Sequence, residues 1–346
     1  MPSPRFVNLR RRLLRTAEKC LYWAGVGSAY VRARQHNGAL ILMYHSVPDE
    51  ELAPWIDPTF AARPEVFRSQ IRFLARHRRP ISMRELVEAC AAGRALPRGS
   101  VVITFDDGYR DNLLTAARIL EEFDLPATFF LATGYVDSGE PQWVDRLYVA
   151  FKRRSLNALD LTGWNLSSWD LSRQPDVDEA HRKISDTLIV SGWQKRLDLL
   201  DDIERQLGPT GTPPRTTLDW DDVRQLARNP RFEIGGHTRH HIDLSTCSEE
   251  ESTSEVMGCL DDILRETGLQ ATHFSYPYGR PGDSVRELLA GAGFESAALT
   301  EPARPIRRED DVLALSRLYA GLGTTMFRFV TSGAYPDLPK ALFGRA

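Results

Sequence analysis

The stretch that decides the fold is Val101-Val102-Ile103-Thr104-Phe105-Asp106-Asp107-Gly108-Tyr109. Its first half is a run of β-branched and aromatic residues, which is typical of a strand buried in a parallel sheet. The run ends abruptly in two adjacent carboxylates and a glycine. In parallel α/β folds, functional groups gather at the carboxyl ends of strands, because the loops there vary while the strands hold position. Asp-Asp-Gly is also an ordinary turn tripeptide, so a purely structural turn stays open as an alternative.

A second strand pattern ends in histidines instead of carboxylates. It runs Phe232-Glu233-Ile234-Gly235-Gly236-His237-Thr238-Arg239-His240-His241. His237 and His241 stand four residues apart, a spacing that brings two imidazoles to one side of a helical turn and suits a shared metal ion. Incidental surface histidines, or His240 in place of either partner, remain open as alternatives. Because the chain has only eight histidines, three of them within five residues favour metal ligation.

One aspartate and two histidines would make a three-ligand site that leaves positions open for water and substrate. Zn²⁺ is the expected ion, and such a ligand set also accepts other first-row metals. Neighbouring side chains at a strand end point in different directions, so one of Asp106 and Asp107 can bind the metal while the other acts as a base. The sequence therefore predicts a metal centre with a general base beside it.

Two further strand ends carry candidate functional residues. Phe274-Ser275-Tyr276-Pro277-Tyr278-Gly279 follows another strand and could form a groove wall or offer a backbone N–H to a developing oxyanion. The first strand ends in Ile41-Leu42-Met43-Tyr44-His45-Ser46. A lone histidine is more often structural than catalytic, but the position of His45 at a strand end, alongside the other three signals, favours a functional role.

Strand and helix patterns alternate from residue 39 onward, which indicates βα units and a parallel sheet or barrel. We predict strands over Ala39–Val47, Val101–Phe105, Ala127–Ala132, Phe232–Gly236, Thr272–Pro277 and Ser296–Leu299. We predict helices over Glu65–His77, Met83–Ala91, Asn112–Phe123, Ser248–Glu266 and Ser284–Ala292.

Residues 137–214 break this alternation and are predicted to form a mainly helical insertion that covers one end of the main domain. The insertion contains Trp143, Trp164, Trp169 and Trp193, which are either its own small core or stacking platforms for a ligand. We expect three parts along the chain: a basic segment over residues 1–36, a main domain over 37–325 and a C-terminal tail over 326–346.

The formal net charge of −3 excludes the global basicity that is typical of nucleic-acid-binding proteins. Residues 1–36, in contrast, are rich in arginine around a short apolar run, which is too short for the roughly 20 residues that span a bilayer. A basic helix lying on an anionic membrane surface and a helix packed on the domain are both open. We expect a cytoplasmic location, at the membrane surface if this segment binds it, and a periplasmic location stays open.

Together these motifs resemble the polysaccharide deacetylase family, also known as the NodB-homology domain or family 4 of the carbohydrate esterases. Thr104-Phe105-Asp106-Asp107-Gly108-Tyr109 matches the first motif in full, and His237-Thr238-Arg239-His240-His241 matches the second, His-(Ser/Thr)-x-x-His. The resemblance covers residues 38 to 325 with an insertion, and it implies an α/β fold, a deformed (β/α) barrel of the NodB type. It also implies Asp107, His237 and His241 as ligands of Zn²⁺ or a similar metal, with Asp106 as the general base.

The third and late motifs depart from the family pattern. Tyr278 aligns with the residue whose backbone N–H meets the oxyanion in the motif Arg-x-Pro-Tyr-Gly, but Ser275 stands in place of the arginine. The late motif reads Leu315-Ser316-Arg317, without the histidine that serves many members as general acid. The sequence is similar to a branch of biofilm poly-N-acetylglucosamine deacetylases with an early Tyr-His motif and a late arginine. This resemblance implies His45 as the general acid and Arg317 as the replacement for the arginine near Asp106.

The resemblance implies a hydrolase of linear amides, a metal-dependent N-deacetylase of exopolysaccharide biosynthesis. Its substrate would be an N-acetylated sugar in a polysaccharide, an oligosaccharide or a glycan precursor, and acetate would be released. One alternative is removal of a formyl or acetyl group from a sugar on a lipid carrier, and another is a carbohydrate-binding homologue with impaired catalysis. The expected partners are the glycan or lipid-linked sugar, with no nucleic acid.

Overall fold

A parallel sheet that almost closes on itself forms the centre of the computed structural model, which describes residues 36–282, 285–300 and 304–332. Seven strands follow one another in the order β10 (Arg317–Tyr319), β1 (Ala39–Tyr44), β3 (Ser100–Phe105), β4 (Ala127–Leu131), β7 (Phe232–Gly236), β8 (His273–Ser275) and β9 (Ser296–Ala298). The short strand β2 (Arg79–Pro80) pairs with β3. Backbone hydrogen bonds join Leu315 to Ala297 and Leu299, which brings β9 toward β10 and nearly closes the barrel. The predicted deformed (β/α) barrel is confirmed.

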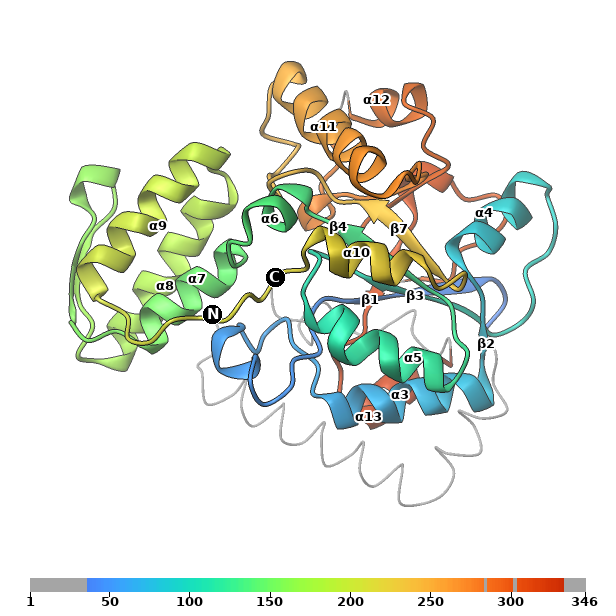
Figure 1. Cartoon of the computed structure of the whole chain (residues 1–346), viewed down its shortest axis with the longest axis horizontal. Helices are drawn as coiled ribbons and strands as arrows, with labels where there is room; N and C mark the ends of the chain where they lie inside the picture. The colour runs from blue at the N-terminus through green and yellow to red at the C-terminus, as the bar shows by residue number, and fades with distance from the viewer. Residues whose placement is uncertain (1–35, 283–284, 301–303, 333–346) are drawn as a thin grey trace, which may run out of the picture.

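Helices surround the outer face of this nearly closed sheet, and side chains fill its interior, so its strands are buried almost throughout. Figure 1 shows α3 (Pro64–His77), α5 (Arg118–Glu122) and α13 (Thr324–Val330) along one side, and α11 (Glu249–Thr267) and α12 (Val285–Gly291) along the other. The barrel also includes α4 (Met83–Ala91), the π-helical turn η2 (Asn112–Ala117) and α10 (Trp220–Ala227).

Several predicted elements are longer than the observed ones, and their boundaries have local causes. The strand predicted over Thr272–Pro277 ends at Ser275, because Pro277 has no N–H to donate to a ladder and instead opens the 3₁₀ turn η4 (Pro277–Gly279). The helix predicted over Asn112–Phe123 begins as a π-helical turn. The strand β10 was not predicted, because three residues are too few to show an alternating pattern.

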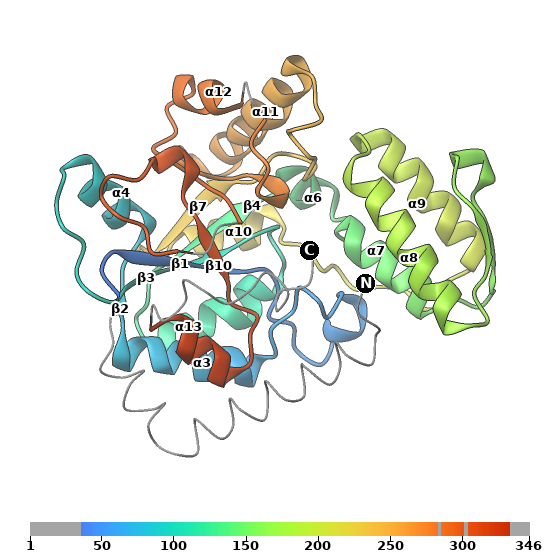
Figure 2. The same cartoon turned by 180° about the vertical axis from the view of Figure 1, so that it is seen from behind.

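The end of the main domain also differs from the predicted boundary at residue 325. Helix α13 crosses that position, and its Phe327 and Val330 are fully buried in the core that α3 and the sheet share. Figure 2, the view from behind, shows α13 beside α3 with β10 above them. The predictions for residues 1–35 and 333–346 lie outside the described residues.

A separate helical unit lies within the predicted insertion range of 137–214. After α6 (Thr133–Ser138), it comprises α7 (Trp143–Lys152), the antiparallel pair β5 (Ala158–Asp160) and β6 (Ser168–Asp170), α8 (Gln174–Ile189) and α9 (Trp193–Leu207). We call residues 142–207 the helical insertion; both views show it to one side of the barrel. Trp143 and Trp169 are buried in its own hydrophobic core and Trp164 packs against that core, which favours the packing role for these three residues.

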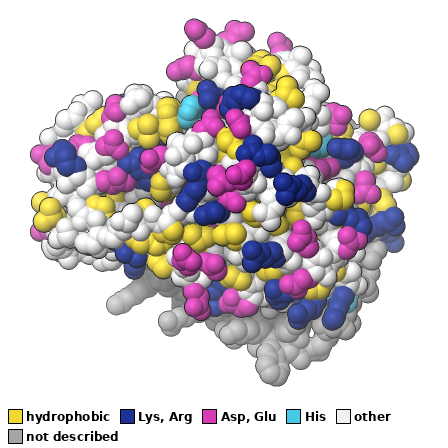
Figure 3. All heavy atoms as spheres, viewed as in Figure 1, with side chains coloured by type: hydrophobic (Ala, Val, Ile, Leu, Met, Phe, Trp, Pro, Cys, Tyr) yellow, Lys and Arg dark blue, Asp and Glu magenta, His cyan; other side chains and the backbone are white. Residues whose placement is uncertain are grey.

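The surface in the orientation of Figure 1 mixes Lys and Arg with Asp and Glu, with no broad region of one sign. Figure 3 therefore agrees with the nearly balanced composition of the chain. None of the described helices is both long enough and apolar enough to cross a bilayer.

Candidate metal centre

Three predicted metal ligands meet at the carboxyl ends of β3 and β7. The Oδ1 atom of Asp107 lies 3.4 Å from Nε2 of His237 and 3.3 Å from Nε2 of His241. One nitrogen or oxygen from each residue lies within 4.8 Å of the others, and the side chains are largely buried. The structure thus brings together the three side chains that the two motifs nominated.

The backbone at these ligands is in an unusual conformation. Asp107 and Gly108 both have a φ of 75°, and in the second motif Thr238 and His241 have φ values of 62° and 50°. A non-glycine residue in this left-handed region costs on the order of 1–3 kcal/mol, and it persists only when surrounding contacts hold it. The loops that carry the ligands must therefore be fixed from outside.

The free atoms of this group fit a divalent cation. Nδ1 of His237 lies 2.7 Å from the carbonyl oxygen of Ser275, which can only accept, so the proton sits on Nδ1 and the lone pair of Nε2 faces Asp107. Oδ1 of Asp107 is buried and has no hydrogen-bond partner among the described residues. A carboxylate oxygen without a donor, beside two imidazole nitrogens, is the donor set of a catalytic zinc site.

The electrostatics of the group favour a cation between the ligands. Burial raises the pKa of Asp107, but the neighbouring histidines, His241 first, outweigh it and hold the pKa below its usual value. Burial lowers the pKa of His241 to about 3, which favours the neutral imidazole that metals need. For His237, burial is outweighed by the charge of Asp106 and the contact with Asp107, so its pKa is raised. A positive charge is therefore stabilised next to the two carboxylates.

The carboxylate of Asp106 pairs with the guanidinium of Arg317 and not with the three candidate metal ligands. Nη1 and Nη2 of Arg317 donate to the two carboxylate oxygens of Asp106 at 2.7 and 2.6 Å, and both side chains are buried. Burial would raise the pKa of Asp106, but the charge of Arg317 and then that of His237 outweigh it and lower the pKa. Such a two-pronged contact holds the carboxylate ionised and fixed in orientation.

Ser275 explains how an arginine from β10 can reach this position. Its hydroxyl lies 3.3 Å from Oδ2 of Asp106 and accepts a hydrogen bond of 2.8 Å from Nη2 of Arg317. The guanidinium also donates to the carbonyl oxygen of Leu299 at 2.9 Å. A small residue at 275 leaves space for the Arg317 side chain. These contacts agree with the prediction that Arg317 replaces the arginine that the family has at the position of Ser275. The catalytic roles stay predictions.

His45 lies at the end of β1 on the same edge of the sheet. Its imidazole lies close enough to Asp106 and Asp107 to contribute to lowering the pKa of both carboxyls. Its Nδ1 is buried without a partner among the described residues, and its ring lies 5.4 Å from that of Phe60. Its backbone carbonyl accepts a hydrogen bond of 2.7 Å from Asn112. The hydrogen bond from Asn112 therefore fixes the loop, and none of the described residues pairs with Nδ1 of the ring.

Tyr278 lies in the turn η4 with a φ of 57°. Its ring meets the ring of His241 edge-on at 4.7 Å, and its hydroxyl accepts a hydrogen bond of 3.0 Å from Nε1 of Trp143. The side chain is thus used for packing against a ligand and the helical insertion. The predicted role of the backbone N–H stays a prediction.

A profile of the polysaccharide deacetylase family matches residues 93–297, which are more than half of the chain. The chain belongs to the polysaccharide deacetylase family. The family assignment made from the motifs is confirmed. The match includes both metal-ligand motifs and the third motif.

Relatives of this deacetylase-family chain were found by sequence and by structure. A poly-β-1,6-N-acetyl-D-glucosamine N-deacetylase of Escherichia coli K12 is 33% identical over 105 residues, which are 30% of this chain and 15% of the relative. The deacetylase PplD of Streptococcus pyogenes is 16% identical with a TM-score of 0.57, covering 87% of this chain and 100% of that one. IcaB of Ammonifex degensii is 17% identical with a TM-score of 0.55, covering 87% and 98%. These two likenesses show the fold.

His240, which the sequence left open as a ligand, is engaged elsewhere. Its Nδ1 lies 2.7 Å from Oε1 of Glu255 on α11, and its ring stacks on Trp193 of α9 at 4.3 Å. Gly134 allows this arrangement, because an added Cβ there would lie 2.6 Å from the His240 ring. His240 therefore supports the second motif in this deacetylase-family site and is not part of the three-residue ligand group.

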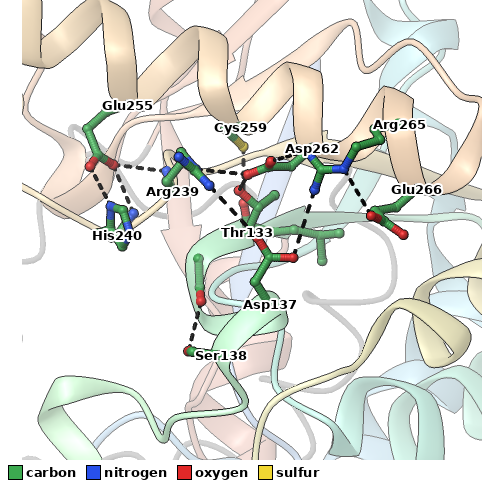
Figure 4. A network of polar contacts seen from close by, with 12 residues as sticks. Thr133, Asp137, Ser138, Arg239, His240, Glu255, Cys259, Asp262, Arg265 and Glu266 are labelled. Carbon is green, nitrogen blue, oxygen red and sulfur yellow. Dashed lines mark hydrogen bonds and ion pairs between the residues drawn. The ribbon is translucent and has the colours of Figure 1, made fainter.

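Figure 4 shows the polar network behind the second motif. Glu255 accepts hydrogen bonds from the backbone N–H groups of Arg239 and His240 at 3.0 and 2.8 Å. The Arg239 side chain donates to Asp262 at 2.9 Å, and Asp262 also accepts from Thr133 at 2.8 Å. Sequence analysis did not identify these supports, because acidic residues on a surface-facing helix pattern give no sign of which backbone groups they meet.

Proposed function

We propose that this chain is a metal-dependent N-deacetylase that hydrolyses the acetamido group of an N-acetylated sugar and releases acetate. The observation that carries the proposal is the ligand group of Asp107, His237 and His241 next to Asp106, a carboxylate that Arg317 keeps ionised. A metal site beside a separate, oriented base is an arrangement that can hydrolyse an unactivated amide.

Asp107, His237 and His241 would hold a divalent ion, with Zn²⁺ as the first candidate, which when bound polarises the amide carbonyl and lowers the pKa of a water molecule. Asp106 takes a proton from the attacking water, because it is ionised and fixed beside the ligands. The two hydrogen bonds from Arg317 keep its carboxylate in one orientation during proton transfer.

The amide nitrogen must be protonated before it leaves as a free amine, since an amide anion is a poor leaving group. His45 is the proposed donor, because imidazole suits proton transfer near neutral pH and this ring lies close to Asp106 and Asp107. The backbone N–H of Tyr278 is the proposed partner of the oxyanion. With these transfers, water and the acetamide become acetate and an amino sugar.

The acid assignment has a direct test. A His45→Ala enzyme should lose about 10²–10⁴ in kcat, the usual contribution of a positioned acid. A kcat within about twofold of wild type would remove His45 from this role, because no general acid contributes so little.

N-acetylglucosamine in a glycan is the proposed sugar. The support is the segment shared with a poly-β-1,6-N-acetyl-D-glucosamine N-deacetylase at 33% identity. A sugar carried on a membrane lipid is the second candidate substrate, favoured by the arginine-rich residues 1–36. The two candidates share the same amide chemistry and differ in what surrounds the sugar.

Acetate release tests the function. The purified, metal-loaded protein should release acetate from β-1,6-linked N-acetylglucosamine oligomers, with β-1,4-linked oligomers and a lipid-linked N-acetyl sugar as the comparison substrates. An Asp106→Asn variant should release none while its metal content stays near that of wild type. Full activity of that variant would refute Asp106 as the base. Absence of acetate from every substrate, with the metal bound, would favour a catalytically impaired carbohydrate-binding homologue.

Metal analysis tests the ligand group separately. His237→Ala and His241→Ala should each lose bound metal after dialysis, because each removes one of three protein ligands. A variant that retains full metal occupancy would exclude its residue from the ligand set.

A further inference from the structure

We propose that the helical insertion positions the metal centre by holding the loops of the three motifs. Gln142, Trp143 and Arg196 are its positioning residues. Each of the three reaches a different backbone or side-chain group on the loops of the three motifs. This inference rests on the metal centre proposed above and assigns to the insertion a role beyond covering one end of the barrel.

Gln142 holds the first motif. It immediately precedes α7, its side chain is buried, and its Nε2 donates a hydrogen bond of 2.9 Å to the carbonyl oxygen of Asp107. Asp107 is the metal ligand whose φ of 75° places it in the left-handed region. A donor fixed by the insertion therefore acts on the peptide that orients this ligand.

Arg196 holds the second motif. Its Nη1 donates to the carbonyl oxygens of His241 at 2.9 Å and His240 at 3.2 Å. Its Nε donates to the carbonyl oxygen of Leu188, inside the insertion, at 3.1 Å. The side chain is fully buried, so one guanidinium ties two parts of the molecule together through donors that no lysine could supply in the same geometry.

Trp143 holds the third motif. Its indole N–H donates to the hydroxyl of Tyr278 at 3.0 Å, while its ring is buried in the hydrophobic core of the insertion. The ring of Tyr278 in turn packs on His241. The guanidinium of Arg196 lies 5.5 Å from the centre of the Trp143 ring. The residue that holds the second motif therefore contacts the residue that holds the third.

These contacts differ from ordinary packing because of what they touch. Asp107, His241 and Tyr278 all have positive φ values, and all three receive a hydrogen bond from the insertion. Backbone in that region keeps its shape only where neighbours hold it. Removing a hydrogen-bond partner that orients a metal ligand commonly weakens metal affinity by about 10–100-fold. The insertion therefore controls the geometry, and with it the affinity, of the metal centre.

Three substitutions remove the donor groups and leave an apolar side chain in their place: Gln142→Met, Trp143→Phe and Arg196→Met, of which the last removes the whole guanidinium. The insertion provides a matched control for each. Gln206 donates to the carbonyl oxygen of Asp160, Trp164 to Asp202, and Arg154 to the carbonyl oxygens of Phe151 and Leu171, all within the insertion. Gln206→Met, Trp164→Phe and Arg154→Met therefore remove the same kinds of donor without touching the motif loops.

Zn²⁺ affinity by competition with a chelator, and the visible spectrum of the Co²⁺-substituted protein, are the first readouts. Each test variant should bind Zn²⁺ about 10–100-fold more weakly and show a changed Co²⁺ spectrum, while each control stays within about twofold. Equal affinity and an unchanged spectrum in all three test variants would overturn the proposal. Equal losses in test and control variants would also overturn it, because they would indicate general destabilisation of the insertion.

Hydrogen exchange of the metal-free protein separates this inference from the function on which it rests. Residues 237–241 should exchange faster in Arg196→Met than in wild type or Arg154→Met, whether or not the wild-type protein binds a metal. Wild-type protein that binds neither Zn²⁺ nor another first-row divalent metal would refute the metal-dependent function. Unchanged exchange in the Arg196 variant would refute the positioning role of the insertion. If Arg196→Met does not fold, Gln142→Met replaces it in this test. Residues 105–109 should then exchange faster in Gln142→Met than in wild type.

Discussion

The carboxylate of Asp106 is held by a guanidinium from β10, 211 residues further along the chain. The contact involves both oxygens of the carboxylate and both terminal nitrogens of Arg317, with both side chains buried. A lysine would restore the charge but only as a single point, without the planar fork that fixes orientation. Arg317 therefore supplies Asp106 with both a positive charge and a fixed orientation, and a lysine would supply only the charge.

Arg317→Lys and Arg317→Met test these two functions. We expect kcat to fall in both variants, by roughly 10² or more in Arg317→Met, because the base loses its orientation and its buried charge is left unpaired. Arg317→Lys should recover part of the rate. Steady-state kinetics with metal content measured in parallel is the check, and a kcat equal to wild type in the methionine variant would show that Asp106 needs no such partner.

Asp111 provides a prediction on pH. This buried carboxyl accepts hydrogen bonds from the Ser46 hydroxyl and the Val47 N–H, and so holds the loop that carries His45. Burial raises its pKa to about 7 despite those donors. An unfolded aspartate has a pKa of about 3.9, so between those values the folded state binds the extra proton. This carboxyl therefore makes folding less favourable as pH rises from about 4 to about 7, by at most about 1.4 kcal/mol per pH unit.

Asp111→Asn should remove that dependence, because the amide cannot ionise. Urea unfolding at pH 5 and pH 7.5 is the measurement, and the loss of stability between the two should be smaller in the variant than in wild type. Asp198→Asn, at an exposed aspartate of the helical insertion, is the control and should behave like wild type. An Asp111 variant with the wild-type pH dependence would contradict the raised pKa.

Sequence motifs located the residues that meet at the site and Arg317 beside Asp106, but not the residues that hold the loops of the candidate metal ligands. Asp107, His237 and His241 follow strand patterns, and strand ends of a parallel sheet must lie at one edge. Gln142 and Arg196 act instead on backbone carbonyl oxygens, and a carbonyl is the same in every residue. No pattern in the sequence can therefore indicate that such a contact exists before the fold is known.

At the scale of elements, the strongly patterned segments were predictable, whereas the short strands β2 and β10 were not predicted. The strand Phe232–Gly236 and the helix Met83–Ala91 were predicted with their observed bounds. Strand β10 was missed as an element, although family resemblance drew attention to its first residue, Arg317. Three residues become a strand here only because β1 offers a partner, which is a tertiary effect.

Helix α13 makes a stability prediction at this scale. Phe327 is fully buried in the main core, whereas Phe329 on the same helix is 36% exposed. Phe327→Ala should lower the free energy of unfolding by about 3–5 kcal/mol, because it removes a buried ring and leaves a cavity. Phe329→Ala should cost much less. Chemical denaturation of both variants is the check, and equal losses would mean that α13 does not belong to the core.

At the scale of the whole molecule, the barrel and the helical insertion each have a hydrophobic core of their own. One lies between the sheet and its helices, and the other lies inside the helical insertion. The ligands belong to barrel loops, while three of the donors that fix those loops belong to the insertion. The geometry of the candidate metal centre therefore depends on the packing of both the barrel and the helical insertion.

Charge is also divided along the chain, and this leads to the prediction about membranes. Residues 1–36 contain eight of the 44 Lys and Arg residues and only one of the 47 Asp and Glu residues, so the remainder of the chain is net negative. Basic residues near an anionic bilayer each contribute about 1 kcal/mol of binding, and salt screens the attraction within about 10 Å at 0.1 M. We propose that this segment directs the chain to anionic membrane surfaces.

Co-sedimentation with vesicles of anionic lipid tests this proposal on the full-length chain and on a chain that begins at residue 37. The full-length chain should bind at low salt, release as salt rises, and bind little to vesicles of neutral lipid, because the attraction is mainly electrostatic. Changing Arg10, Arg11 and Arg12 to Gln should weaken binding in the way that the truncation does. Equal sedimentation of the full-length and truncated chains would assign any membrane affinity to the folded domain. If the affinity did not change with salt, apolar insertion into the bilayer rather than charge would be its cause.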